Sequence, residues 1–271
     1  MENFLLSSWA TLKKNQRTSK RAYPFSFMLG RIINAVGGLL FPITLYYLVF
    51  DKQMSGSFVQ AYPGITYISY ITLGSSALIF TISTIMSVSR SLIMEMREGT
   101  LHHLLLSPMS RAGYFVGVYL EQLIRSIIEL GTVLIFGILF GARIGLTSIL
   151  PLIIFIILFS FTAFCLAILI SNIMLFSRDT FITQNTLLIV LTIFSGAAFP
   201  TVFLPSLLRI IANLLPTTQL LNAFRNVVIL KHSLVSESYS IFYSVSISVV
   251  VLIIGLCWYK KLEQKLVNET L

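Results

Sequence analysis

Long apolar stretches separated by short polar segments dominate the chain, and six of them are candidates for membrane spans. A helix needs about 20 mostly apolar residues to cross a bilayer. With approximate limits, the candidates are residues 27–50, 65–88, 115–140, 146–176, 181 to a break at 195–200, and 239–259. The fourth is longer than a span requires, which favours a tilted or extended helix. The pattern therefore predicts an all-α integral membrane fold with six transmembrane helices.

The first 24 residues predict a helix of a different kind. Apolar side chains between Phe4 and Leu12 fall on one stripe and precede a basic cluster, the reverse of the order in a secretory signal. Trp9 belongs to this stripe, and an indole ring favours the depth of the lipid headgroups. We therefore expect residues 1–24 to form an interfacial amphipathic helix, with a frayed tail as the alternative. Residues 25–271 would then form one six-span domain.

A second irregular segment precedes the last span. Residues 195–231 are apolar, but Pro200, Pro205 and Pro216 interrupt them. The stretch 204–215 is too short to cross a bilayer. We expect it to form a re-entrant or interfacial helix on the outer face, between the fifth and sixth spans, because irregular backbone survives in a membrane only where protein covers it.

Composition places most of this chain in lipid. Of its 271 residues, 56% are hydrophobic and 11% are charged, and the mean hydropathy is +0.89; a soluble domain would carry far more charge. The net charge of +9 forms no single basic patch, so nucleic-acid binding is not expected. With a cytoplasmic N-terminus, twelve Lys and Arg residues lie inside and five outside. This bias predicts that both termini, and the interfacial helix, face the cytoplasm.

The most polar internal segment is EMREGTLHHLLLSPMSR, between the second and third expected spans. Its leucines Leu101, Leu104 and Leu105 recur at helical spacing, and Pro108 would end the helix soon afterwards. A short amphipathic helix in a cytoplasmic loop either lies on the lipid surface or docks in the groove of a partner. The residues alone leave both interpretations open.

Two segments of the chain resemble the type-2 ABC transporter permeases. The polar segment matches the family's loop between its second and third spans at Glu95, Arg97, Gly99, Thr100, Leu101, Leu104, Leu105, Pro108, Ser110 and Arg111. A segment before the last span matches at Ser195, Gly196, Phe199, Pro200, Leu204, Pro205, Pro216, Thr217 and Arg225. Both motifs occur in the family's order around six spans, so the resemblance covers nearly the whole chain. One departure is His102, where many members of the family carry an acid.

The resemblance implies that the loop is a coupling helix seated in a cleft of a separate ATP-binding subunit. Its leucines would enter the cleft, while Glu95, Arg97 and Glu98 would form pairs at the rim, where charges set orientation more than affinity. Gly99 would supply the turn before the helix. The chain has no glycine-rich loop that could cradle phosphates, so ATP and Mg²⁺ are expected on the partner. Two ATP-binding subunits and a second permease, identical or paralogous, would complete the transporter.

Polar residues inside the spans are candidates for a transport pathway. Glu121, Arg125 and Glu129 are spaced four apart and share one face of the third helix. They indicate a polar path or, as the favoured interpretation, a self-neutralising structural triad near the cytoplasmic boundary. Arg31 could reach the interface by snorkelling.

In the dimers of this family the second and fifth spans line the central interface. Here these spans carry mildly polar residues, which fit either an amphipathic substrate or simple helix packing. The candidates for the pathway are Tyr70, Ser75, Gln184 and Asn185.

Other chemistry is not expected. His102, His103 and His232 lack the spacing of metal ligands, both cysteines lie in apolar runs, and no serine has the surroundings of a nucleophile. We therefore expect no catalytic residue, metal or cofactor in this chain.

The expected function is that of a permease subunit of an ABC exporter, with multiple spans in a bacterial cell membrane. The substrate would be amphipathic, such as a drug or an antimicrobial peptide. The alternatives are export of a lipid-linked polysaccharide of the teichoic-acid or O-antigen type, and a non-transporting membrane scaffold or sensor.

Overall fold

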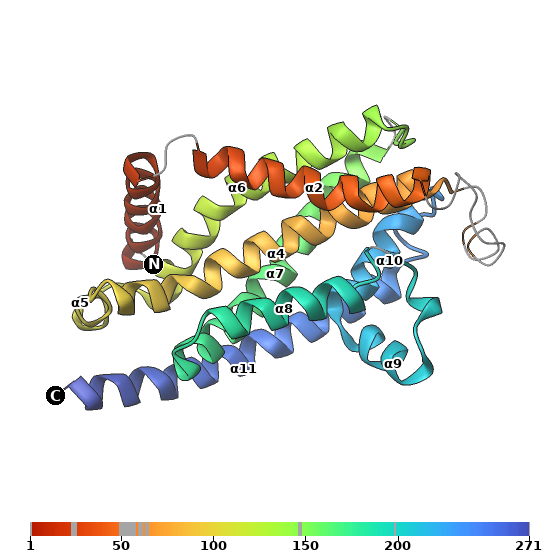
Figure 1. Ribbon diagram of the computed structural model, residues 1–271. Coiled ribbons are helices and arrows are strands. Elements are labelled where there is room, and N and C mark those ends of the chain that lie inside the picture. The colour runs from red at the N-terminus through yellow and green to blue at the C-terminus, as the bar shows by residue number, and fades with distance from the viewer. Residues whose placement is uncertain are drawn as a thin grey trace.

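The structure, a computed structural model, describes residues 2–22, 26–48, 58, 62, 65–145, 148–197 and 199–270. The regular elements within these ranges are all helices (Figure 1). In chain order they are α1 (Glu2–Ala22), α2 (Ser26–Leu48), α4 (Tyr67–Arg97), α5 (Leu101–Leu106), α6 (Arg111–Leu139), α7 (Ile149–Ser177), α8 (Phe181–Phe194), the 3-10 turn η2 (Thr201–Phe203), α9 (Ser206–Leu214), α10 (Pro216–Val228) and α11 (Ser238–Thr270). The predicted all-α membrane fold is confirmed.

Among the described residues, five helices are long and apolar enough to cross a membrane. They are α2, α4, α6, α7 and α11, and they correspond to five of the six expected spans. The expected fifth span is α8, whose 14 residues extend only about 21 Å, less than the roughly 30 Å of a hydrocarbon core. The helix stops there because Ser195 ends it and Gly196 turns the chain with a φ of 74°. The fifth span is therefore shorter than the sequence pattern predicted.

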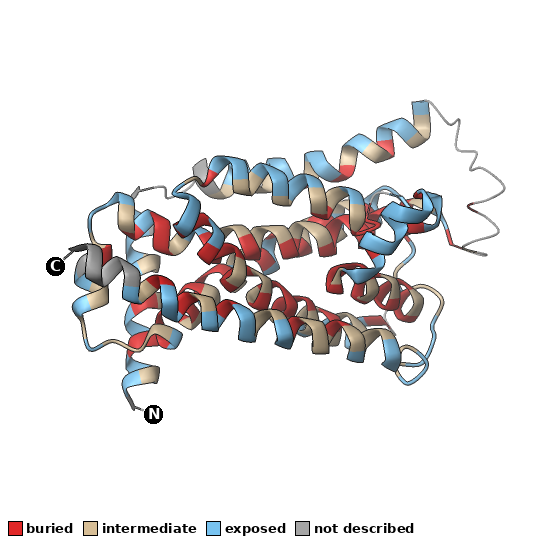
Figure 2. Ribbon diagram, turned by 90° about the horizontal axis from the view of Figure 1, so that it is seen from below, coloured by how far each residue is buried: buried red, intermediate tan, exposed pale blue. Residues whose placement is uncertain are grey.

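The centre of the bundle is α4. Within its most apolar window 72% of the residues are buried, against 17% in α2 and in α11. It packs against α6 on one side and α7 on the other, and α11 packs against α7. Figure 2 shows the buried residues gathered in the middle of the bundle, with α2 along its edge. Lipid would cover the exposed apolar faces of these outer helices.

The two ends of the bundle differ. Both termini, α1 and α5 lie at one end, and η2, α9 and α10 lie toward the other (Figure 1). At that second end α9 buries only Ala212, as suits a helix at an interface. Leu215 and Pro216 then start α10, which is largely buried and packs against α4, α7 and α11. A helix was expected at 204–215, where α9 lies, whereas α10 was not predicted.

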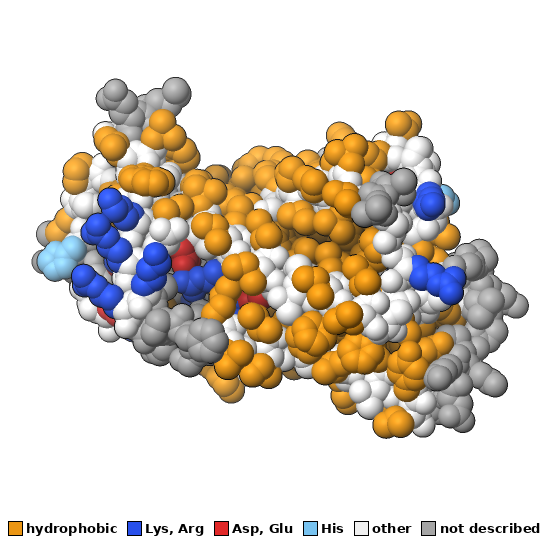
Figure 3. Space-filling view, turned by 90° about the horizontal axis from the view of Figure 1, so that it is seen from above, with side chains coloured by type: hydrophobic (Ala, Val, Ile, Leu, Met, Phe, Trp, Pro, Cys, Tyr) orange, Lys and Arg blue, Asp and Glu red, His pale blue; other side chains and the backbone are white. Residues whose placement is uncertain are grey.

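The N-terminal helix α1 crosses α6 through small residues. A Cβ on Gly113 would lie 2.8 Å from the Phe4 carbonyl oxygen, and one on Gly117 would lie 2.5 Å from the Ser8 carbonyl oxygen. Such pairs of glycines four apart allow helix backbones to approach closely. The apolar stripe of α1, including Trp9 at 64% exposure, is turned outward. Figure 3 shows Lys and Arg side chains gathered at this end of the molecule, with hydrophobic side chains over most of the rest of the face.

Candidate functional site

The loop predicted to couple with an ATP-binding subunit is a helix, a turn and a short helix. The second span does not end near residue 88 but continues as α4 to Arg97. Gly99 makes the turn with a φ of 72°, which glycine adopts without steric cost. The predicted short helix is α5, and Pro108 follows its end. Ser110 then caps α6 by accepting a hydrogen bond from the Gly113 N–H at 3.2 Å.

Glu95 lies inside this loop and not at its rim. Its residue exposure is 7%, and its carboxylate accepts hydrogen bonds from the Tyr114 hydroxyl at 3.4 Å and from the Thr100 hydroxyl. Lys14 of α1 pairs with it, with 2.5 Å between Nζ and Oε1. The Glu95 carboxylate thus joins α1, α4 and α6, because a buried charge needs partners within the protein. Its role as a docking charge stays a prediction.

The Arg111 guanidinium also bonds to groups within the chain. It donates to the Leu104 carbonyl at 2.8 Å and the Leu105 carbonyl, two of the groups left without partners at the end of α5. It also pairs with Glu263 of α11, with 2.7 Å between Nε and Oε1. Arg111 thus closes the end of α5 and connects it to α11.

A further contact connects the loop to the fifth span. Arg97 donates to the Thr180 hydroxyl at 3.1 Å, directly before α8. Asp179 accepts from the first backbone N–H of α8, that of Phe181, at 2.7 Å, which stabilises the start of this helix. The loop around α5 is therefore fastened to α1, α8 and α11.

The leucines of the loop face in two directions. Leu101 is 7% exposed and belongs to the core, and Leu104 and Leu105 pack partly against the same cluster. Leu106 is 64% exposed. It shares the outward side of the loop with other exposed residues, and we call this set the outer face: Arg97, Glu98, Gly99, His103, Leu106 and Pro108. The helical spacing predicted the helix correctly, but the leucines that it placed on the docking face pack toward the core. Leu106 lies outside that spacing, so the pattern did not single it out.

The charged residues of α6 form two ion pairs, one within α6 and one with α2. Arg125 pairs with Glu121 on the same helix, as expected of residues four apart. Glu129 instead pairs with Arg31 of α2 and accepts a hydrogen bond from the Ser83 hydroxyl at 2.6 Å. The interpretation as one self-contained triad is therefore incomplete, because its third member joins α2, α4 and α6. Arg31 is held by this pair and by Gln122, at 3.2 Å, and does not simply snorkel.

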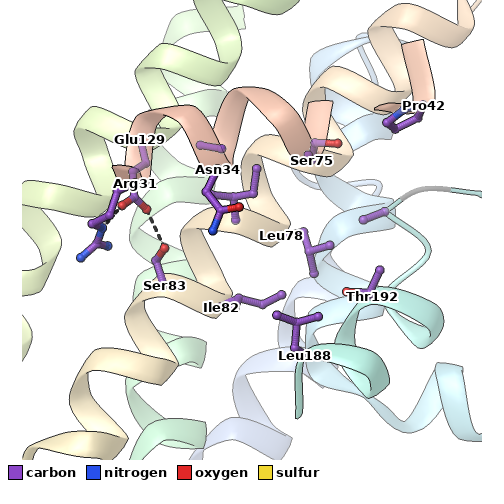
Figure 4. A pocket seen from close by; sticks show the side chains of 14 residues that line it. Arg31, Asn34, Pro42, Ser75, Leu78, Ile82, Ser83, Glu129, Leu188 and Thr192 are labelled. Atoms are coloured by element: carbon purple, nitrogen blue, oxygen red, sulfur yellow. Dashed lines mark hydrogen bonds and ion pairs between the residues drawn. The ribbon is translucent and has the colours of Figure 1, made fainter. Parts of the chain in front are cut away.

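Beside Arg31 and Glu129 lies a pocket between α2, α4 and α8 (Figure 4). Its volume is about 340 Å³. Ser75, one of the predicted pathway residues, lines it together with Leu78 and Ile82 from α4, and Leu188 comes from α8. Arg31, Glu129 and Ser83 meet on one side of the pocket. The pocket thus combines apolar walls with one charged side.

The other predicted pathway residues lie elsewhere. Gln184 is partly buried and Asn185 is exposed, both on α8 and neither against the pocket. Tyr70 is completely buried and donates a hydrogen bond from its hydroxyl to the Gly196 carbonyl at 3.0 Å. Tyr70 holds the turn after α8. It is not one of the residues that line this pocket.

The most buried charge in the described chain is Arg225, on α10. Its guanidinium lies 3.6 Å from the centre of the Tyr70 ring and donates to the Gly196 and Ala197 carbonyls, at 2.8 Å each. Gly74 of α4 leaves the space for it, because a Cβ there would clash with Arg225 and with Ala197. The sequence motif included Arg225 but carried no sign of this role. The aromatic ring and the carbonyls stand in for a carboxylate partner.

A comparison with known families finds one match. The family described as ABC-2 type transporter matches residues 8–229, which include the coupling loop and the pocket. No curated protein matches the chain. Since the match covers most of the chain, this protein belongs to the ABC-2 type transporter family and is a membrane component of a transporter.

Proposed function

We propose that the chain is the permease subunit of an ATP-driven exporter and that α5 is the coupling helix that seats in a separate ATP-binding subunit. One observation carries the proposal: the loop around α5 is fastened to α1, α8 and α11 by Glu95, Arg97 and Arg111, while its outer face stays exposed. We place this end of the bundle in the cytoplasm because basic side chains gather there (Figure 3). Both termini then lie in the cytoplasm as well.

The outer face has the composition of a docking surface. Leu106 projects from a polar loop, and burying a leucine side chain gains about 2 kcal/mol. Arg97 and Glu98 flank it at the start of the loop. Charges in such positions orient a partner and add little affinity. ATP and Mg²⁺ would be held by the partner, and two ATP-binding subunits would serve a pair of permeases.

The contacts of the loop offer a route for movement into the membrane. A displacement of the loop around α5 would reach the start of α8 through Arg97 and Thr180, and α11 through Arg111 and Glu263. Since α8 forms one wall of the pocket, movement of α8 would change the shape of the pocket. ATP hydrolysis on the partner would in this way alter access to the bound substrate.

The pocket supports an amphipathic substrate. Its volume of about 340 Å³ suits a compact molecule or one end of a longer one, in keeping with a drug or an antimicrobial peptide. The exposed surface of α8, which buries only Leu191, supports a second permease packed against it.

Reconstitution tests this function. The chain is co-expressed with a candidate ATP-binding subunit, and the purified complex is placed in vesicles that contain a fluorescent cationic or anionic amphipath. We expect ATP-dependent movement that requires both chains. A chain that reaches the membrane, binds no ATP-binding subunit and moves no amphipath would favour the scaffold or sensor.

A further inference from the structure

We infer that the pocket between α2, α4 and α8 binds the anionic end of an amphipathic molecule, with Arg31 as its anchor. The inference rests on the proposed function in one respect: such a molecule would be the exporter's substrate. The anionic group would be a carboxylate or a phosphate, and its apolar chain would occupy the rest of the pocket.

The distribution of side chains in the pocket matches an amphipath. Arg31, Asn34 and Glu129 lie on one side, and in Figure 4 the Asn34 amide points into the space between the helices. The side toward α8 is mainly apolar, with Leu188 and, from α4, Leu78, and the Thr192 hydroxyl is a polar group on this side. A polar group with an apolar chain would satisfy both sides at once, whereas a uniformly polar or apolar ligand would satisfy only one.

The charges near the pocket favour an anion. Glu129 pairs with Arg31, and Glu121 pairs with Arg125. Arg90 lies on α4 about two turns from Ser83, and its charge acts unfavourably on that of Arg31. Among the described residues, the two ion pairs and Arg90 bring three guanidinium groups and two carboxylates to this part of the bundle. Charges within a membrane segment are costly, so an anionic ligand would lower the electrostatic energy of the cluster and a cationic one would raise it.

Of the ion pair Arg31–Glu129, Arg31 is the residue that would bind the anionic group of the ligand. Glu129 accepts from Arg31 and from Ser83, and its side chain is 2% exposed. The Arg31 side chain is 15% exposed and lines the pocket. A guanidinium presents its donors in a planar fork, which matches a carboxylate or phosphate. Asn34, one turn further along α2, adds an amide donor on the same side.

Photolabelling of the purified permease, without any ATP-binding subunit, tests the inference. The chain is placed in phosphatidylcholine nanodiscs with one of three diazirine probes of equal chain length: a fatty acid, its trimethylammonium analogue, and a phosphatidylglycerol. Labelled residues are identified by mass spectrometry. We expect the fatty acid to label Leu78, Ile82 or Leu188 at least about tenfold more than the ammonium analogue. Preferential labelling by phosphatidylglycerol would also support the anionic anchor and would identify a lipid headgroup as its source.

Variants separate the anchor from the fold. Arg31→Gln combined with Glu129→Gln removes the pair without leaving one charge buried, and we expect the fatty-acid labelling to fall about tenfold. Arg31→Lys should retain part of the fatty-acid labelling. Arg209→Gln, which replaces an exposed arginine at the other end of the bundle, should retain all of it. Equal labelling by the ammonium analogue, or labelling unchanged by the paired substitution, would overturn the inference. Since no ATPase is present, either result leaves the docking role of α5 standing.

Discussion

Lys14 of α1 and Glu95 of α4 form an ion pair, with 2.5 Å between Nζ and Oε1, that connects the helix at the N-terminus to the coupling loop. The two ends of the pair are unequal. The side chain of Lys14 is 51% exposed, whereas that of Glu95 is 9% exposed. Glu95 also accepts from Tyr114 and Thr100, so it supports the loop by contacts that Lys14 does not share.

This asymmetry gives the first prediction. Lys14→Ala should lower the free energy of unfolding by about 1 kcal/mol, because water screens the half-exposed Lys14 and Glu95 keeps its hydrogen bonds from Tyr114 and Thr100. Glu95→Ala should cost about 2–3 kcal/mol, since it leaves buried hydroxyls without their acceptor. Thermal unfolding of the purified variants in one detergent compares them. Equal losses from the two substitutions would show that the ion pair, and not the buried network, holds the loop.

The crossing of α1 over α6 gives the second prediction. Gly117→Val should separate the two helices, because a Cβ there would already lie 2.5 Å from the Ser8 carbonyl oxygen. The measurement is the rate of trypsin cleavage after Lys13 and Lys14, which should rise. Gly131→Ala is the matched control, on the same helix with nothing within 4 Å of its Cβ. Unchanged cleavage in Gly117→Val would mean that α1 does not depend on this contact.

The third prediction concerns Arg225. Arg225→Met should destabilise the protein by about 3–5 kcal/mol, because it removes a buried, hydrogen-bonded charge and leaves the Gly196 and Ala197 carbonyls without their donor. Arg209→Met, at an exposed position of α9, serves as its control. Melting temperatures should fall strongly in the first variant and little in the second. Similar melting temperatures for both would contradict a structural role for Arg225.

The sequence predicted the fold better than the site. Runs of apolar residues identify spans because lipid demands a long uninterrupted apolar helix, and α2, α4, α6, α7 and α11 follow this rule. The length of α8 was overestimated, because the residues after Phe194 are apolar yet leave the helix at Gly196. Hydropathy records where apolar residues are and does not record where the backbone turns.

The same limit applies to individual side chains. Helical spacing placed Leu101, Leu104 and Leu105 on one face correctly, but it could not tell whether that face meets a partner or the protein's own core. The pairing of Glu129 with Arg31 joins residues 98 apart in the chain, and four-residue spacing favoured a partner on the same helix. Contacts between helices that are distant in the sequence determine both what the leucines face and which residue pairs with Glu129.

Topology gives the fourth prediction. In a variant without Cys165 and Cys257, single cysteines near Lys14, Glu98 and Lys261 should resist an impermeant thiol reagent in intact cells. One placed at Ser236, at the other end of the bundle, should react, and so should one at Asn213 of α9. Labelling at Glu98 from outside would reverse the proposed orientation.

The proposal for α5 depends on the outer face of the loop. Leu106→Asp would put a carboxylate into the apolar cleft of the partner, and an unpaired buried charge costs several kcal/mol. A loss of about 4 kcal/mol weakens association roughly a thousandfold. The folded permease should be spared, because Leu106 is 64% exposed. Val235→Asp, at an 81% exposed position toward the opposite end, is the matched control.

The deciding measurement is the amount of ATP-binding subunit that co-purifies with each variant, at equal amounts of membrane-inserted permease with an unchanged melting temperature. We predict that Leu106→Asp loses the ATP-binding subunit and the ATP-dependent transport, while Val235→Asp keeps both. If Leu106→Asp inserts normally and retains the ATP-binding subunit at the wild-type level, the outer face of α5 does not dock, and the coupling role proposed for this loop is wrong.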